Sequence, residues 1–425
     1  HDHKYDPISQ KNYFQLFSFF NNVPENGLIQ PYGAIPKPFI KLTQKEIDEQ
    51  LTFINNLDTI AEIPLMVMEE MPKPRQAHVL NRGAYDQPTD PVFPNTPESV
   101  LTFGENLPKN RKGLAEWLFD EKNPLTARVA VNRLWQQLFG VGIVSTSDDF
   151  GNQGALPTHP ELLDFLAIKF REDGWDEKAM LKYIVSSATY QQSAKANEQV
   201  LEIDPENQLL ARASRIRLSA EMIRDHALKI SGLLSKEIGG PSVKPYQPDG
   251  LWAETIGGGG GSLAKYIQDE GYKLYRRSLY TFWKRTVPPP SMMTFDASTR
   301  DLCTVKRQRT STPLQALVLL NDPQIIEATR VMAQNIVSEV ETPEERIGQL
   351  FRLATSRQPT SDEVNTLKDY LAEELTYFEE SPEKAEEYLN IGAYQMNYDL
   401  PEPEMAAYAM LASAIFNLDE SISRG

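Results

Sequence analysis

The sequence predicts a mainly α-helical protein, in which a multi-helix body carries a few short strands and long loops rich in proline and glycine. Two capping boxes, at 342–345 and 360–363, each precede apolar residues at helical spacing. We therefore expect a helical hairpin there, followed by a final helix through 406–416. By contrast, the proline-rich stretch 72–108 shows little periodicity and suits an extended connector with one or two strands.

The stretch 300–330 predicts two helices that meet at a polar corner. Thr312 before Pro313 is a helix start, since threonine caps well and proline fits the first helical position. The apolar run 314–320 suits a buried helix. Asn321-Asp322-Pro323 then ends this helix and caps the next one. We expect Cys303, just upstream, to be a small buried hydrophobic residue.

Local sequence patterns predict further helices, strands and loops. An N-terminal helix is expected with Asp6 as its N-cap and with Tyr13, Leu16, Phe17 and Phe20 on its apolar face. Other expected elements are a polar helix over 44–57, strands over 63–68 and 274–283, a helix that starts at Ser219, and a flexible loop at Gly257 to Gly261.

Composition limits the classes of function. The chain has 425 residues, with 43 lysines and arginines against 59 aspartates and glutamates, for a net charge of −16. A chain this acidic is not expected to coat nucleic acid or an anionic membrane. The sequence contains no apolar run long enough for a transmembrane segment. A single cysteine excludes an intramolecular disulfide and a cysteine-based zinc site.

Charge is unevenly distributed. Residues 273–309 include nine basic and two acidic residues, whereas 331–425 include six basic and nineteen acidic residues. These segments are either ordinary packed or solvated faces, or the basic one forms an anion-binding concavity beside aromatic side chains. We expect Arg307 and Arg309 to serve the corner at 321–322 or an anion beside it. The candidate anion-binding residues are Arg276, Arg277, Lys306, Arg307 and Arg309.

A second polar group lies on the helix expected after Ser219. Its acidic members are four residues apart and would repel each other unless a cation separated them. A structural salt network is the favoured interpretation. A general acid/base pair is the alternative, although no nucleophile motif accompanies it. The residues of this group are Arg217, Glu221, Arg224, Asp225 and His226.

Several strings resemble a known family. The pattern RxRTxTPLQALxLLNDPQ at 307–324, together with 123–151, 217–252 and 416–420, resembles a PSD-type domain of unknown function from planctomycete-type, cytochrome-c-associated proteins. The resemblance covers roughly 108–425. It implies an extracytoplasmic location, periplasmic or secreted. We therefore expect a helical domain of unknown function over 108–425, with 334–425 as a candidate helical subdomain, after a proline-rich connector region over 39–107.

The N-terminal string HDHKYDPISQ resembles the end of a PSCyt-type domain, so that 1–38 would be the C-terminal tail of a preceding cytochrome-associated domain. In related full-length proteins the residues before it look like Cys-x-x-Cys, and His1 would complete a c-type haem attachment motif. Haem c is thus expected in the full-length protein. No cofactor is expected on this chain itself, which has only Cys303. Alternatively, His1, His3 and Asp6 bind a divalent metal.

The leading functional expectation is an accessory or docking domain of an extracytoplasmic, cytochrome-c-linked protein, with a role in electron transfer. Its partner would be a cytochrome module or another redox protein. The alternative is an enzyme or binding module that acts on an anionic polysaccharide through the basic, aromatic-rich region. Whether the chain is an enzyme is left open by the sequence.

Overall fold

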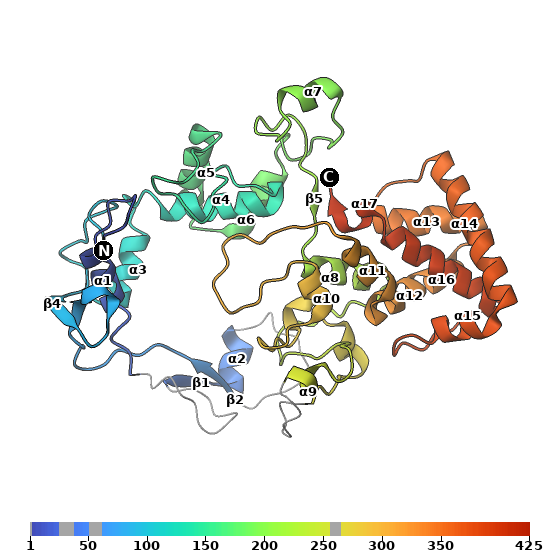
Figure 1. The fold of residues 1–425 in the computed structure, drawn as a ribbon, viewed down its shortest axis with the longest axis horizontal. Helices are drawn as coiled ribbons and strands as arrows, with labels where there is room; N and C mark the ends of the chain where they lie inside the picture. The colour runs from blue at the N-terminus through green and yellow to red at the C-terminus, as the bar shows by residue number, and fades with distance from the viewer. Residues whose placement is uncertain (1, 25–37, 51–61, 256–264) are drawn as a thin grey trace. The chain divides into compact units, whose positions relative to one another are not determined.

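The computed structural model describes residues 2–24, 38–50, 62–255 and 265–425 (Figure 1). The fold is mainly α, as predicted, and its few strands are short and antiparallel. The chain divides into two compact units. The first contains His1–Thr52 and Thr59–Ser214, and the second contains Phe53–Asp58 and Arg215–Gly425. The domain limits expected from the sequence stay a prediction, and the expected glycine loop at 257–261 lies outside the described residues.

The first helix starts later than predicted. Helix α1 (Gln10–Ser18) has Ser9 as its N-cap, in a capping box with Asn12. Asp6 was the wrong N-cap, because its carboxylate instead accepts a hydrogen bond of 2.7 Å from the backbone N–H of Asn152. The expected apolar face was also wrong, since Tyr13 is 61% exposed while Phe14 is buried. Phe14 packs against the β3–β4 pair, which decides the orientation of the helix.

Two antiparallel strand pairs follow in the first unit. Strand β1 (Phe39–Thr43) pairs with β2 (Glu62–Met66), which confirms a strand close to the predicted position, and α2 (Gln44–Gln50) begins where the polar helix was expected. Strand β3 (Ala77–Leu80) pairs with β4 (Pro88–Val92) inside the proline-rich stretch. A short 3-10 helix, η1 (Asn81–Gly83), lies in the turn between them.

The rest of the first unit is helical. Trp135 stacks on Phe139 with 4.1 Å between ring centroids, and the two belong to a core that α4, α5 and α6 share. Hydrogen bonds from side chains hold loops of this unit in place. The side-chain amide of buried Asn132, for example, accepts from the backbone N–H of Val144 and donates to its carbonyl. The helices are α3 (Arg111–Leu118), α4 (Thr126–Phe139), α5 (Pro160–Glu172), α6 (Glu177–Val185) and α7 (Glu198–Ile203).

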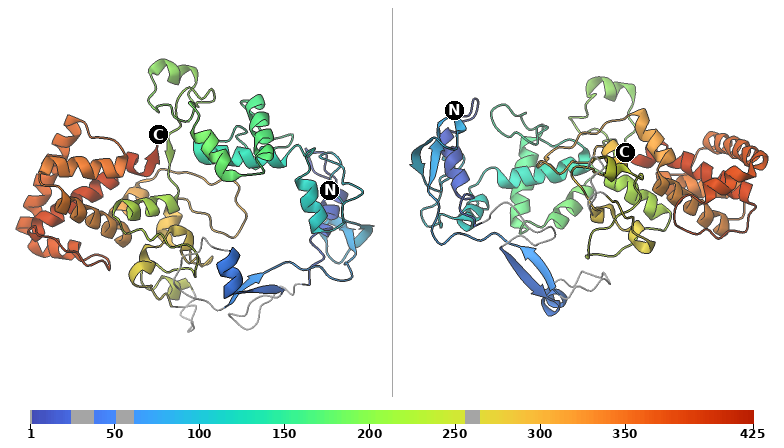
Figure 2. Two further views of the ribbon diagram at one scale, coloured as in Figure 1. Left: turned by 180° about the vertical axis from the view of Figure 1, so that it is seen from behind. Right: turned by 60° about the horizontal axis from the view of Figure 1, so that its bottom comes forward.

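The second unit is a helical bundle with an irregular side. The red and orange helices gather in one bundle in Figure 1 and in both views of Figure 2. Its helices are α8 (Ala220–Ile230), α9 (Leu251–Thr255), α10 (Pro290–Thr294), α11 (Pro313–Asn321), α12 (Pro323–Glu339), α13 (Pro343–Thr355), α14 (Ser361–Glu380), α15 (Pro382–Leu389), α16 (Glu402–Phe416) and α17 (Asp419–Ile422), and it also contains the strand pair β5 (Ile216–Arg217) and β6 (Ser423–Arg424).

Helix α16 is the centre of this bundle. It is buried on nearly all sides, and its alanines let α12, α13, α14 and α15 approach closely. Thr342 and Thr360 cap α13 and α14 as the capping boxes predict, and the two helices pack as a hairpin. In the described part of the chain, no helix is both long and apolar enough to cross a bilayer.

The expected strand over 274–283 was wrong. The segment instead forms two 3-10 helices, η2 (Gly271–Tyr275) and η3 (Ser278–Tyr280). Side chains of α8 and isolated β-bridges to Ser235 and Val243 pair its backbone groups, without a continuous strand ladder. Asp225, for example, accepts a 2.7 Å hydrogen bond from the backbone N–H of Ser278.

The polar corner at 321–323 is confirmed, because α11 ends at Asn321 and Asp322 caps α12. The apolar run before it is only half buried, however. Leu319 is inside, but Leu314 is 56% exposed. Cys303 is exposed as well, which corrects the expectation of a buried cysteine. It lies on the irregular segment 299–311, whose residues are all exposed.

The core of the second unit yields a stability prediction. Leu350 of α13 is fully buried, whereas Leu353 on the same helix is 37% exposed. Leu350→Ala should lower the free energy of unfolding by about 2–5 kcal/mol, because it removes buried methyl groups and leaves a cavity. Leu353→Ala should cost less than about 1 kcal/mol. Urea unfolding measures both, and equal losses would contradict this description of the core.

Candidate functional site

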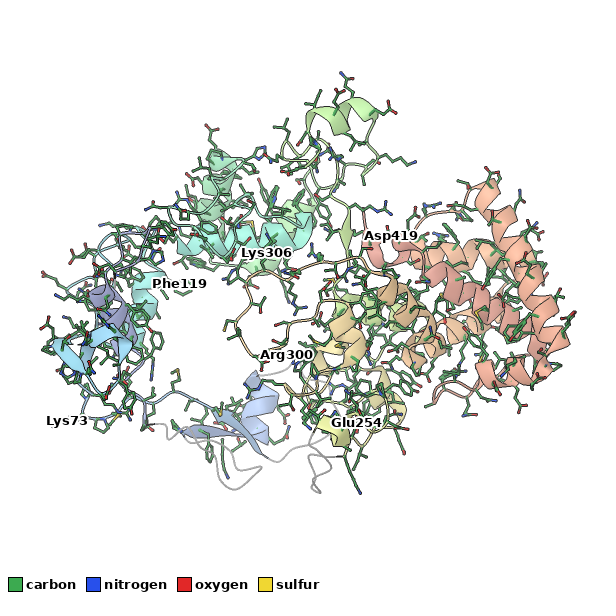
Figure 3. The ribbon with its side chains drawn as sticks, viewed as in Figure 1. Lys73, Phe119, Glu254, Arg300, Lys306 and Asp419 are labelled. Carbon is green, nitrogen blue, oxygen red and sulfur yellow. The ribbon has the colours of Figure 1, made fainter. Side chains whose placement is uncertain are left out.

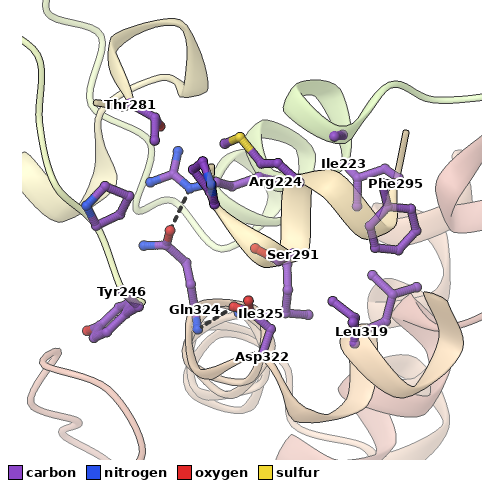
Figure 4. Close-up of a pocket in the computed structure, with 15 residues that line it drawn as sticks. Ile223, Arg224, Tyr246, Thr281, Ser291, Phe295, Leu319, Asp322, Gln324 and Ile325 are labelled. Atoms are coloured by element: carbon purple, nitrogen blue, oxygen red, sulfur yellow. Dashed lines mark hydrogen bonds between the residues drawn. The ribbon is translucent and has the colours of Figure 1, made fainter. Parts of the chain in front are cut away.

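A small cavity lies where α8, α10, α11 and α12 meet (Figure 4). Its volume of about 40 Å³ is enough for a few water molecules. Apolar side chains from α10 and α11 close one side, and polar groups gather on the other. The polar groups on its wall belong to Arg224, Tyr246, Thr281, Ser291, Asp322 and Gln324.

Arg224 is the central cation of the site. Its Nε donates to Gln324 Oε1 over 2.5 Å, and Nη2 donates to the carbonyl of Leu274 over 2.8 Å. Its Nη1 donates to the carbonyl of Arg276 and to Ser278 Oγ. Burial lowers the pKa of Arg224 to about 10. Four hydrogen bonds to acceptors of the protein therefore satisfy a guanidinium that is largely buried.

The opposite charge comes from Asp322 at the start of α12. Its carboxylate accepts hydrogen bonds from the backbone N–H groups of Gln324 and Ile325, and burial raises its pKa. Thr281 is different, because its hydroxyl is buried and has no partner among the described residues. A buried hydroxyl needs a partner. The cavity therefore offers one unused hydrogen-bonding group, beside two charges that are already satisfied.

Below the cavity, α12 carries a row of buried polar side chains, Gln324, Glu327, Arg330 and Gln334, which we call the polar spine. Gln324 Nε2 donates to the carbonyl of Leu274 over 2.9 Å. Glu327 is completely buried, and its Oε1 accepts hydrogen bonds from Tyr246, Tyr275 and the backbone N–H groups of 393 and 394 over 2.7–3.1 Å. Burial, and then the charge of Glu327, raise the pKa of both tyrosines.

The rest of the spine binds the segment before α16. Arg330 donates to the carbonyls of Ile391 and Tyr394 over 2.7 Å each, and burial lowers its pKa. Gln334 accepts from the backbone N–H of Asn397 over 2.8 Å. Gly392 has a φ of +95°, and a Cβ atom there would lie 2.7 Å from the carboxyl carbon of Glu327. This position therefore requires glycine.

The polar group predicted on α8 does not form one network. Arg217 pairs with Asp296 over 2.5 Å, and Glu221 pairs with Arg307 over 2.8 Å. His226 makes a 3.1 Å hydrogen bond to the carbonyl of Ala354. Asp225 binds Ser278, as described above, and lies 3.7 Å from Arg224. Arg224 and Asp225 thus share Ser278, the other three side chains bind separate segments, and Arg224 alone of the five lines the cavity.

The predicted anion-binding residues also separate. Arg276 is 1% exposed, donates to the carbonyls of Pro241 and Gly239, and stacks on Tyr280, so it supports the local fold. Arg277 and Lys306 are exposed. Arg307 pairs with Glu221 and not with the corner at 321–322, and the alternative, an anion beside the corner, stays a prediction.

Arg309 does not serve the corner either. It is exposed at the residue level, and the described residues give it no carboxylate partner. Partial burial and the nearby charges of Arg217 and Arg424 lower its pKa. The two arginines that were expected to act together therefore differ, since Arg307 is neutralised and Arg309 lies among other cations.

The N-terminal metal prediction is not tested. His1 lies outside the described residues. His3 Nδ1 accepts a 3.0 Å hydrogen bond from the backbone N–H of Asp6 and lies 3.1 Å from its carboxylate. Within the described ranges, no three His, Cys, Asp or Glu side chains come close enough to hold a metal ion. The metal and haem assignments for this end of the chain stay predictions.

Sequence reasoning missed the polar spine. Its members recur three or four residues apart, as the solvent face of an amphipathic helix does. Two features could have revealed the spine. The residues of α12 between its members are mostly apolar, and α12 faces long loops whose backbone groups need hydrogen-bond partners.

His226 provides a pH test. Burial lowers its pKa in the folded protein, whereas a histidine in an unfolded chain titrates near about 6.5. Below that pH the unfolded state takes up the proton more readily, so the stability of the unit should fall as pH decreases until the folded pKa is passed. In His226→Gln this part of the pH dependence should vanish. Urea unfolding between pH 5 and 8 measures it, and parallel profiles would contradict the burial of this ring.

Comparison with known protein families assigns this chain to one of them. A search of curated proteins found no match, and a search of solved structures found none either. The family described as "PSD1: Protein of unknown function (DUF1553)" matches residues 110–371, which is more than half of the chain and includes α8, the polar corner and the polar spine. The chain therefore belongs to the PSD1 family of proteins of unknown function (DUF1553).

Proposed function

We propose that this chain is an accessory module that docks within a larger, extracytoplasmic, cytochrome-c-linked protein and supports its electron transfer. Family membership over 110–371 supports the proposal, together with the N-terminal string whose relatives resemble a cytochrome-associated domain. His1 would then be the iron ligand that follows two upstream cysteines, and haem c would be a cofactor of the whole protein.

The docking role is supported by the groups that the buried polar side chains bind. Arg224 and the polar spine bind mainly backbone groups of the segments 274–278 and 391–397. Such contacts fix irregular loops in one conformation. A binding surface that is already ordered before its partner arrives loses less conformational entropy on binding. The arrangement therefore suits recognition more than a reaction centre.

The test uses the longer protein with the residues that precede His1. We expect thioether-linked haem in a pyridine haemochrome assay of that protein. The control is the chain of 425 residues, which should carry none because Cys303 cannot form the two-cysteine motif. A carbodiimide cross-link between the haem-bearing part and residues 215–425 should also form at low salt. A longer protein without covalent haem, or without any such cross-link, would overturn the proposal.

A second candidate function is binding of an anionic polysaccharide, and cation–aromatic contacts in the second unit favour it. Arg300 lies over Trp283 at 4.5 Å from the ring centroid, and Lys284 lies over Trp252 at 4.3 Å. Arg300 and Lys306 lie along the same irregular segment (Figure 3). Exposed Arg277 and Arg309 add to the positive charge. Cations beside aromatic faces suit sulfated sugars.

Retention on immobilised dextran sulfate tests this second candidate, with uncharged dextran as the matched resin. Retention should occur at low salt and disappear at high salt, since exposed charges are screened. The triple variant Arg277→Gln, Lys306→Gln, Arg309→Gln should elute at clearly lower salt. The control triple Arg352→Gln, Lys368→Gln, Lys384→Gln changes net charge equally on the acidic helices. Equal elution of the two triples would exclude this surface.

A further inference from the structure

A much larger cavity lies in the first unit, and it shares no lining residue with the cavity beside Arg224. Its volume is about 530 Å³, which is within the range of small-molecule sites. The end of α1, the segment 70–76, the end of β4 and the start of α3 surround it. The backbone N–H of Met71 donates to the carbonyl of Asn22 over 3.0 Å, which ties two of these walls together.

One side of this cavity is apolar and partly aromatic. Phe19 is 1% exposed and packs against Phe103 with the rings tilted by 47° and 5.6 Å between their centroids. Phe93 is different, because it lines the cavity while 61% of it is exposed. Two prolines, at 74 and 94, complete this side. Such a wall suits the C–H face of a ring.

The lining also includes two cations. Arg75 and Lys109 line the cavity, and in the described part of the chain neither side chain makes a hydrogen bond or an ion pair. Glu70 also lines it, but Oε1 of Glu70 accepts a 3.3 Å hydrogen bond from the backbone N–H of Arg111. The carboxylate is thus held at the start of α3, and two cations remain for a ligand.

Two buried polar atoms around the cavity lack partners among the described residues. They are the side-chain carbonyl oxygen of Asn22, which lines the cavity, and Nη1 of Arg111, next to the lining residue Asn110. Buried polar atoms are normally hydrogen-bonded, so an atom without a protein partner can take one from water, an ion or a ligand. Arg111 is the first residue of α3, whose N-terminal end adds positive potential. The charge left unused here therefore favours an anion.

We propose that this cavity binds a small organic oxyanion of monosaccharide size, a ring that bears a carboxylate or a sulfate ester. Arg75 and Lys109 would bind the oxyanion, the amide of Asn22 would bind a hydroxyl, and the ring would lie against Phe93. The site goes beyond the proposed function, because its residues precede or only just reach the family match and belong to the other unit from the polar spine.

Saturation-transfer difference NMR with glucuronate, glucose 6-sulfate and neutral glucose tests the proposal on the whole chain. One or both anions should receive saturation at millimolar concentration, and glucose should receive much less. The variant Arg75→Gln, Lys109→Gln should reduce the transfer at least fivefold, and Phe93→Ala should reduce it as well. The control Lys73→Gln, Lys122→Gln removes the same charge from exposed positions outside the cavity and should keep it.

Other outcomes overturn the proposal. Absence of transfer to both anions would do so, as would equal transfer to glucose. A third outcome is saturation transfer that persists in the Arg75→Gln, Lys109→Gln variant and disappears in the triple variant of Arg277, Lys306 and Arg309. That result would assign the anion to the second unit instead. Melting curves of all variants should match, because the substituted side chains are exposed. Haem attachment in the longer protein is measured separately, so either proposal can fail alone.

Discussion

The backbone of long irregular loops must find hydrogen-bond partners, and in the second unit one helix supplies many of them. Gln324, Glu327, Arg330 and Gln334 are buried on α12 and bind backbone groups of two loop segments. An unpaired backbone group inside a protein costs about as much as a lost hydrogen bond. Without the polar spine, the loops could not lie against the bundle, and the cavity beside Arg224 would not form.

This requirement explains why α12 is polar and buried at once. Its other side packs along α16, whose alanines allow a close approach. A charge such as that of Glu327 is costly to bury unless hydrogen bonds compensate it. Four donors on Oε1 provide most of this compensation, and Gly392 leaves the space for two of them to come close, while Oε2 has no partner among the described residues. The corner at Asp322 then fixes where the spine begins.

The sequence predicted those parts of the fold that depend on local chemistry. Thr312, Thr342 and Thr360 cap helices because the cap and its partner lie within one turn. Prediction from the sequence failed where residues far apart in the chain determine the local structure. Asp6 and Ser9 are both good caps, and the contact of Asp6 with Asn152 selects Ser9. Arg307 was expected to act at the nearby corner but pairs with Glu221, 86 residues away on α8. The polar spine was hidden because its spacing matches that of a solvent-facing helix side.

The two cavities differ in how their polar groups are used, and this difference separates a structural site from a binding site. Beside Arg224, the protein itself satisfies the guanidinium and the carboxylate, and one hydroxyl is left over in about 40 Å³. In the first unit, about 530 Å³ is bordered by two cations and a buried amide oxygen that have no partner in the described part of the chain. Burial of charge alone therefore identifies an element that the fold needs. Charge left unsatisfied beside empty volume identifies a place where a ligand supplies the missing contacts.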